Sequence, residues 1–173
     1  MKSLLHLSCA LIYMTILGGC AGYQLGNVPY AEMKGVEKIY VPIVHNQTYE
    51  PGIQVMVTNA IIRRFNQDGT YETGRLAEAD ATLEVTLTDF KRDALRRARS
   101  NSLVTEEYRL NLHAIATLTN HRTGQKLFDK EVVIGDTSIY VNENRFQENE
   151  RQAMPLAAEA LAYEIVRRVT EGW

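Results

Sequence analysis

The sequence predicts an α+β fold, a two-layer sandwich in which two helices cover one face of a four-stranded, mostly antiparallel sheet. Two observations lead to this prediction. The middle of the chain alternates apolar and polar residues with a period of two, which is typical of half-buried strands. An amphipathic stretch with the period of a helix lies on each side of those strands, one near residues 53–67 and one near residues 147–170.

The N-terminus has the pattern of a bacterial lipoprotein signal peptide. Lys2 precedes an apolar stretch from Leu4 to Ile16, which leads into the run Leu17–Cys20 with two glycines before the cysteine. A basic start, an apolar middle and small residues before a cleavage point define such a signal. We therefore expect a signal peptide over residues 1–19, cleavage before Cys20, and attachment of lipid, palmitate included, at Cys20. An ordinary secretory signal, or a buried helix that ends in cysteine, is the alternative interpretation.

The expected location follows from the same region. The apolar stretch is shorter than the ~20 residues of a membrane-spanning helix, so the mature chain should be anchored by its lipid and not embedded. Ala21 stands where an aspartate would indicate retention in the inner membrane of a Gram-negative cell. We expect anchoring to the periplasmic face of the outer membrane. Residues 20–35 then form a lipidated tether, and residues 36–173 form one domain.

The first elements of this domain are a strand and a helix. Ile39–Val44 is a short apolar strand, and Pro42, which has no amide hydrogen, places it at an edge or on a bulge. Apolar residues then recur every four positions on one helical face: Ile53, Val57, Ile61 and Phe65. Gly69 is a natural C-terminal cap for this helix, and residues 70–73 can form a short strand.

Three longer strands and a final helix complete the domain. Apolar residues alternate with polar ones from Ala81 to Leu87 and again from Tyr108 to Leu118, and residues 126–140 form a further strand region. Such alternation predicts an antiparallel sheet with one covered face. The other face should carry Thr82, Glu84, Thr86, Thr88, Asn111, His113 and Thr117. The helix over residues 147–170 has an apolar stripe made of Met154, Ala158, Leu161, Ile165 and Val169.

Composition and motifs argue against several functional classes. A formal net charge of −2 does not favour general nucleic-acid binding. Cys9 lies in the signal peptide and Cys20 would carry lipid, so no cysteine remains for a disulfide or a zinc site. The mature chain has three histidines without metal-ligand spacing: His45, His113 and His121. Adjacent carboxylates are interpreted as solvated charges: Glu106, Glu107, Glu148 and Glu150. We expect no enzymatic activity, no metal and no cofactor.

One local cluster of cations stands out, and we call residues 91–99 the basic segment. It places five cations among nine residues: Lys91, Arg92, Arg96, Arg97 and Arg99. Because the segment follows an amphipathic strand and precedes Ser100, it should lie at the tip of a long hairpin. Arginines bind phosphates through paired hydrogen bonds, so these cations are candidates for a polyanionic lipid headgroup. A solvated loop that discourages edge-to-edge strand pairing is the alternative.

The mature chain resembles the lipopolysaccharide-assembly lipoprotein family, LptE. The resemblance rests on several stretches in the family's order, none of them diagnostic alone: Cys20–Leu25, Ile39–Gly52, Ala79–Val85, Tyr108–Leu110 and Thr123–Leu127. It implies a non-enzymatic lipoprotein that sits inside the outer-membrane β-barrel LptD as a plug and assembly factor, and that helps insert lipopolysaccharide into the outer leaflet. It also implies lipopolysaccharide binding, for which the basic segment is the candidate.

Two other functional classes stay open at this stage. Lipoproteins of secretion pores and activators of peptidoglycan synthases also begin with a strand of this kind, followed by a helix and further strands. A periplasmic hydrolase is the third interpretation, and the sequence offers neither a nucleophile motif nor an acid–base pair for it.

Overall fold

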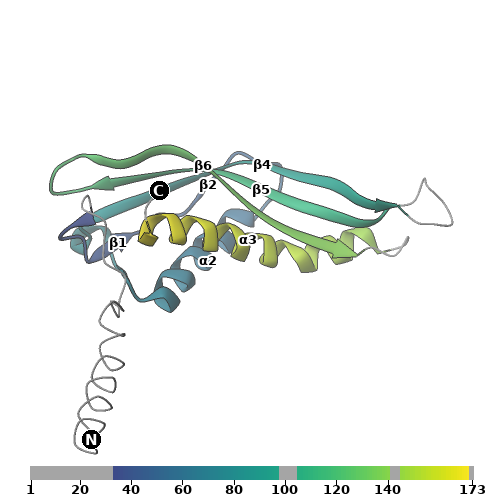
Figure 1. Ribbon diagram of the computed structural model, residues 1–173, viewed down its shortest axis with the longest axis horizontal. Helices are drawn as coiled ribbons and strands as arrows, with labels where there is room; N and C mark the ends of the chain where they lie inside the picture. The colour runs from purple at the N-terminus through teal and green to yellow at the C-terminus, as the bar shows by residue number, and fades with distance from the viewer. Residues whose placement is uncertain (1–32, 98–104, 141–144, 172–173) are drawn as a thin grey trace, which may run out of the picture.

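The computed structural model describes residues 33–97, 105–140 and 145–171. Within these residues, two helices and a short 3-10 turn accompany a single sheet of six strands (Figure 1). The elements are β1 (Lys38–Tyr40), β2 (His45–Asn46), α2 (Ile53–Asp68), β3 (Glu72–Thr73), η2 (Leu76–Glu78), β4 (Ala81–Arg97), β5 (Thr105–Asn120), β6 (Lys126–Tyr140) and α3 (Phe146–Glu171).

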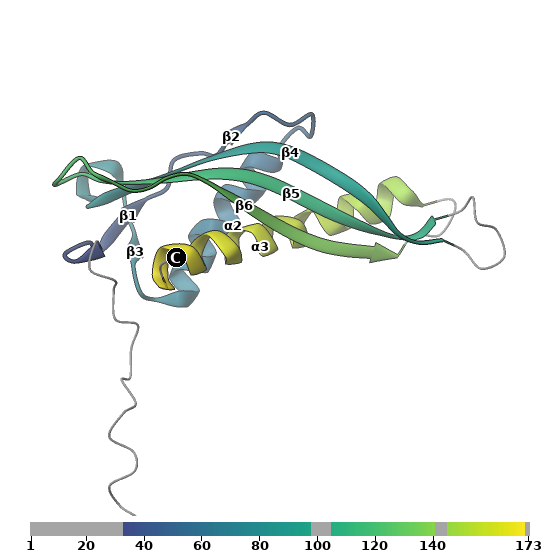
Figure 2. The same cartoon turned by 45° about the horizontal axis from the view of Figure 1, so that its top comes forward.

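The α+β class and the two-layer arrangement are confirmed, but the four-stranded sheet was wrong. The strands lie in the order β3-β1-β4-β5-β6, and β2 also pairs with β4. β4, β5 and β6 are antiparallel, whereas β1 pairs in parallel with both β3 and β4, and β2 pairs in parallel with β4. Both helices lie on the same side of the sheet (Figure 2). The sheet is therefore mixed, because α2 returns the chain to the end where β1 began.

Only the first two residues of the predicted strand over residues 39–44 lie in a strand, because β1 ends at Tyr40 and β2 begins at His45, one residue past the predicted end. Pro42 cannot donate a backbone hydrogen bond, and the amide of Val44 donates instead to Thr58 Oγ1 on α2, at 3.0 Å. Tyr40 pairs with Thr82 and His45 pairs with Thr86, so four residues of this segment oppose three residues of β4. The segment between β1 and β2 is thus a bulge.

The core lies between the sheet and the two helices, as the patterns predict. α3 packs against β5, β6 and α2. Every residue of the two predicted helical stripes is buried, and so are the alternating apolar residues of β4 from Ala81 to Leu87. The predicted cap is also confirmed, because Gly69 has φ 74° and its N–H donates to Phe65 O at 2.9 Å. Hydrophobic periodicity therefore located both layers correctly.

Asp80 joins the start of β1 to the start of β4. Its Oδ2 accepts the backbone N–H groups of Glu37 at 2.9 Å and Lys38 at 3.0 Å. These two hydrogen bonds lower the pKa of the Asp80 carboxyl below its usual value, and Arg122 lowers it further, against the opposing effect of burial. A carboxylate with a lowered pKa stabilises the fold above its unfolded-state pKa, and the stabilisation is lost as the pH falls through the folded-state pKa.

Asp80→Asn should lower the free energy of unfolding by about 1 kcal/mol at pH 7, since it weakens two charge-assisted hydrogen bonds. The difference from the wild type should begin to shrink below about pH 4, the usual pKa of an aspartate in the unfolded chain, and should be lost as the pH falls through the lowered folded-state pKa. Urea unfolding at pH 7 and pH 3 measures both values. Asp136→Asn is the control, because that side chain is 59% exposed and lies 3.7 Å from Arg109. An equal deficit for Asp80→Asn at both pH values would contradict the assignment.

Candidate interaction surface

The basic segment lies towards the far end of β4, on the hairpin that β4 forms with β5, and its described residues do not form the solvated loop that was the alternative. β4 continues through Arg97, so residues 91–97 belong to a strand, and Arg99 lies outside the described residues. A register shift between Leu87 and Asp89 changes which side chains face the helices. Beyond the shift, Arg92 pairs with the buried Leu110 on the helix-facing side. The cations are thus divided between the two faces of β4.

Arg92 is engaged inside the protein. Its Nε donates to Glu150 Oε1 of α3 at 2.6 Å, and its Nη2 forms ion pairs with both Glu150 and Glu50. The guanidinium also lies 4.7 Å from the centroid of the Phe90 ring. Burial lowers the pKa of Arg92, but the hydrogen bonds to Glu150 and Glu50 raise it more, so the net shift is upward. Arg92 therefore connects β4, the start of α3 and the loop before α2.

The interpretation of Glu150 as a solvated charge was wrong. The residue is 8% exposed and is the buried partner of Arg92. Its position carries a signal that could have revealed this, because Glu150 precedes Met154 by one helical turn on the apolar stripe of α3. Glu107 is similar, since its side chain is 13% exposed and lies 3.6 Å from Arg96. Glu150 therefore serves as an internal counter-charge for Arg92, whereas Glu107 is a more loosely held partner of Arg96.

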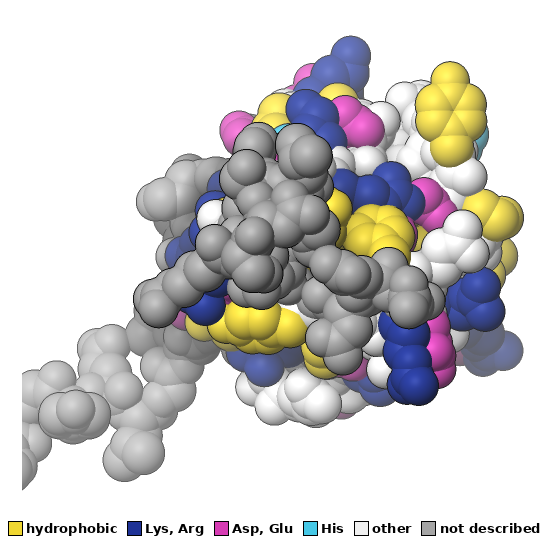
Figure 3. Space-filling view, turned by 90° about the vertical axis from the view of Figure 1, so that its right-hand side faces the viewer, with side chains coloured by type: hydrophobic (Ala, Val, Ile, Leu, Met, Phe, Trp, Pro, Cys, Tyr) yellow, Lys and Arg dark blue, Asp and Glu magenta, His cyan; other side chains and the backbone are white. Residues whose placement is uncertain are grey.

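Two further cations of the basic segment, Lys91 and Arg96, are more accessible than Arg92. Lys91 lies 3.5 Å from Asp89, and the side chains of Lys91 and Arg96 are 53% and 62% exposed. Figure 3 shows Lys and Arg side chains next to Asp and Glu side chains on this end of the molecule. Ion pairs of this length and exposure are weak. Lys91 and Arg96 can therefore exchange their partners for an external anion, whereas Arg92 cannot do so without uncovering two carboxylates.

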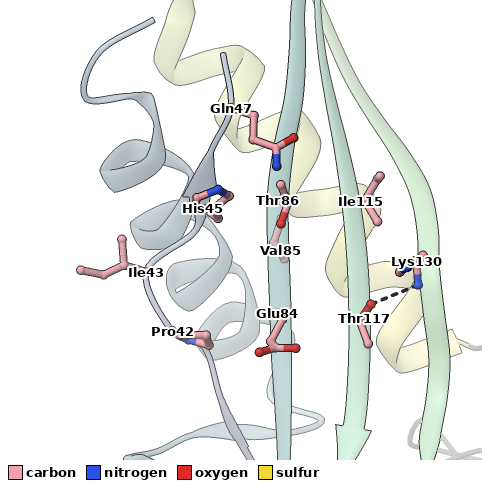
Figure 4. A pocket seen from close by; sticks show the side chains of 10 residues that line it. All are labelled: Pro42, Ile43, His45, Gln47, Glu84, Val85, Thr86, Ile115, Thr117 and Lys130. Carbon is pink, nitrogen blue, oxygen red and sulfur yellow. Dashed lines mark hydrogen bonds between the residues drawn. The ribbon is translucent and has the colours of Figure 1, made fainter. Parts of the chain in front are cut away.

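The sheet face turned away from the helices, here called the outer face, contains a groove of about 560 Å³ (Figure 4). The groove lies where the bulge between β1 and β2 moves away from β4. Its floor is formed by β4 and β5, and Lys130 of β6 closes one side, where its N–H donates to Thr117 Oγ1 at 3.0 Å. The lining residues are Pro42, Ile43, His45, Gln47, Glu84, Val85, Thr86, Ile115, Thr117 and Lys130.

The groove and its surroundings are mixed in character. Glu84 and Lys130 are the acidic and basic residues of the lining, and their charges offset each other. Apolar side chains lie beside these polar groups, with Ile43 75% exposed and Val132 57% exposed. Ile115 of β5 stands directly opposite Val132 of β6. Apolar residues beside polar groups whose charges offset each other suit a protein–protein contact better than a site for a polyanion.

The ring of His121 is held by Thr82 Oγ1 at 2.7 Å and by Ala79 O at 2.8 Å, which gives it a structural role. Among the described residues, no group of His, Cys, Asp and Glu side chains is arranged to hold a metal ion. No helix in the described part of the chain is long and apolar enough to cross a membrane. The predicted lipidation site, Cys20, lies outside the described residues.

Comparison with protein families gives one match over most of the domain. The model of the LptE family, described as lipopolysaccharide-assembly, matches residues 36–169. No protein of curated function matches the sequence.

Several solved structures share the fold at low sequence identity. A hypothetical protein from Chlamydia trachomatis has a TM-score of 0.57 at 11% identity, and the match covers 78% of this chain and 95% of that protein. A protein from Xanthomonas campestris has a TM-score of 0.57 at 12% identity, with 79% and 85% covered. An uncharacterized lipoprotein B from Nitrosomonas europaea has a TM-score of 0.50 at 12% identity, with 87% and 88% covered. At such identities the similarity establishes the fold alone.

Proposed function

Because the family match extends over residues 36–169, the chain belongs to the LptE lipopolysaccharide-assembly family, and we propose that it is the lipoprotein partner of an LptD-type β-barrel. In this proposal Cys20 carries the lipid that anchors the chain to the periplasmic face of the outer membrane. The domain plugs the barrel, assists its assembly and helps insert lipopolysaccharide into the outer leaflet. The chain contributes binding and rigidity and performs no covalent chemistry.

The observation that supports this proposal most is the outer face of the sheet. A plug needs a rigid body whose surface can form hydrogen bonds, because the lumens of large outer-membrane barrels are polar and wet. The outer face meets this need with hydroxyl, amide and imidazole groups along β4 and β5, and with ion pairs such as Arg109–Asp136. The opposite face of the sheet is filled by α2 and α3, which makes the domain stiff.

Affinity capture of tagged full-length protein from detergent-solubilised outer membranes tests the proposal. A stoichiometric large β-barrel of the LptD type in the captured fraction is the expected result. A secretion pore or a peptidoglycan synthase without such a barrel would replace the proposal with that alternative.

The lipidation site is tested separately. Cys20→Ala should abolish palmitate labelling and membrane anchoring, and persistent labelling would contradict the assignment of Cys20.

Lipopolysaccharide binding is the second part of the proposal, and the accessible cations of the basic segment are its candidate contacts. Lys91 and Arg96 are exposed and weakly paired. Arg97 lies in β4 and Arg99 lies beyond the described residues, so both remain candidates. The phosphates of lipid A are suitable partners for arginine side chains. Arg92 is withdrawn from this set, because its guanidinium is held by two carboxylates of the chain itself.

Replacing Lys91 and Arg96 together by glutamine should weaken lipopolysaccharide binding about tenfold, which corresponds to the loss of charge-assisted hydrogen bonds. The salt dependence of binding should fall as well, because fewer charges are involved. Titration of labelled lipopolysaccharide at two salt concentrations measures both effects. The control variant replaces Arg63 and Arg75 by glutamine, two exposed cations elsewhere on the surface. Equal losses in the two variants would show that net charge alone determines binding.

A further inference from the structure

The loop between β2 and α2 is held in one conformation by Asn46. Its Oδ1 accepts the N–H of Thr48 at 2.9 Å and the hydroxyl of Thr48 at 2.7 Å. Its Nδ2 donates to the backbone oxygen of Glu50 at 2.9 Å and to Gln54 Oε1 at 3.2 Å. One side chain thus connects the beginning, the middle and the end of the loop, which leaves the loop backbone little freedom.

A second set of contacts fixes the loop to the body of the domain. The Glu50 carboxylate pairs with Arg92 of β4, which also holds Glu150 of α3. Gly52 then takes φ 84° as the chain enters α2, a conformation that glycine adopts without strain. The loop is therefore as well positioned as the sheet and α3 to which it is attached.

This ordered loop presents an aromatic side chain fully to solvent. Tyr49 has a relative exposure of 102%, so its ring buries no surface against the rest of the domain. Burying an aromatic ring in a partner yields a large apolar contact, and a rigid loop loses little conformational entropy when it does so. Tyrosines of this kind are frequent among the residues that dominate interface energies.

The surroundings indicate the kind of partner. Gln47, at the start of the same loop, and His45 of β2 line the outer-face groove together with the exposed Ile43 (Figure 4). Glu84 and Lys130 balance each other in the groove lining, and Glu50 is paired with Arg92, so this surface has no excess positive charge for a polyanion and suits a partner surface without strong net charge. These features suit a protein partner whose surface has an apolar pocket, and they suit an anionic lipid headgroup poorly.

We propose that Tyr49 is the anchor through which this domain docks onto the inner wall of its barrel partner, with Ile43 and the outer-face groove in contact beside it. The inference rests on the proposed function, since it assigns the surface of this chain that meets the barrel. The tyrosine ring enters a pocket of the wall, and the hydroxyl group keeps its access to water or to a polar rim.

The test compares the affinity of purified, detergent-solubilised barrel for immobilised protein variants. Tyr49→Ala should raise the dissociation constant at least tenfold, whereas Tyr49→Phe should stay within about threefold of the wild type. Leu156→Ala is the matched control, because Leu156 is 58% exposed on α3, in the helical layer, and should also stay within about threefold. All three variants should melt like the wild type, since the replaced side chains are largely solvated.

The two proposals can fail separately in this experiment. Wild-type affinity of Tyr49→Ala would overturn the role of Tyr49 and leave the barrel partnership intact. A wild-type protein that binds no barrel would overturn both. A benzophenone side chain placed at position 49 should transfer to the barrel, and transfer to lipid instead would show that Tyr49 faces the membrane and would overturn the inference.

Discussion

Gly135→Ala should destabilise the domain by about 3 kcal/mol, at the upper end of the usual cost of overpacking a core. A Cβ atom at this position of β6 would lie 2.2 Å from the backbone nitrogen of Leu161 and 2.4 Å from its Cα. Real Cβ contacts do not occur at such distances, and backbone atoms cannot rotate away as a side chain can. α3 would have to move off the sheet along with Leu161, which is completely buried.

Urea unfolding of the two variants Gly135→Ala and Gly74→Ala measures this effect with its control. The nearest atom to a Cβ at Gly74 is 3.7 Å away, an ordinary contact, so that variant should stay within about 1 kcal/mol of the wild type. Adding Leu161→Ala should not rescue Gly135→Ala, because the closest atoms belong to the backbone. Stability within 1 kcal/mol for Gly135→Ala would mean that α3 and β6 can separate at little cost.

Gly135 also shows how far a sequence can be interpreted. A glycine inside a strand indicates a close approach of another backbone, and this signal is visible in the sequence. The sequence does not indicate which element approaches Gly135, because that depends on where α3 crosses β6. The stripes of α2 and α3 were predictable for the opposite reason. They depend only on the local spacing of hydrophobic residues, which defines the buried face of a helix whatever element packs against it.

The internal position of Arg92 could not be predicted, because it depends on a single residue of register in β4. Without the shift after Leu87, odd-numbered residues of β4 would continue to face the helices, and Arg92 would point to solvent with the outer-face residues. A shift by one residue exchanges the two faces of a strand, and it depends on pairing with β5. The parallel pairs of β1 and β2 were missed for a similar reason, since they join segments far apart in the sequence.

The candidate docking surface combines a predictable part and an unpredictable part. The polar outer face follows from alternation, and Thr86 and Thr117 do lie there beside the groove. The groove itself depends on the bulge around Pro42, for which the sequence indicates only an irregular or edge strand. The exposure of Tyr49 has no local signal either, because the sequence around an aromatic residue in a loop does not determine whether its ring packs on the domain or faces solvent.

Arg92→Met should lower the free energy of unfolding by about 2 kcal/mol, because it leaves the carboxylates of Glu150 and Glu50 without their cation. Removing one partner of a fully buried ion pair costs about 3–5 kcal/mol. A smaller value applies here, since the side chains of Arg92, Glu50 and Glu150 are 34%, 24% and 11% exposed and solvent screens them in part. Methionine retains most of the aliphatic packing against Phe90, so the loss reports mainly on charge.

A double-mutant cycle with Glu150→Met separates the internal role of Arg92 from a role in ligand binding. Removing both charges should recover much of the stability lost in Arg92→Met, because an apolar pair of similar volume replaces a desolvated ion pair. Lipopolysaccharide affinity per folded molecule should stay within about threefold of the wild type in Arg92→Met, in contrast to the variant at Lys91 and Arg96. Unchanged stability with lost affinity would return Arg92 to the headgroup site. The expected result instead means that Arg92 holds the loop before α2, β4 and α3 together, and that ligand contact is left to the exposed cations of the same strand.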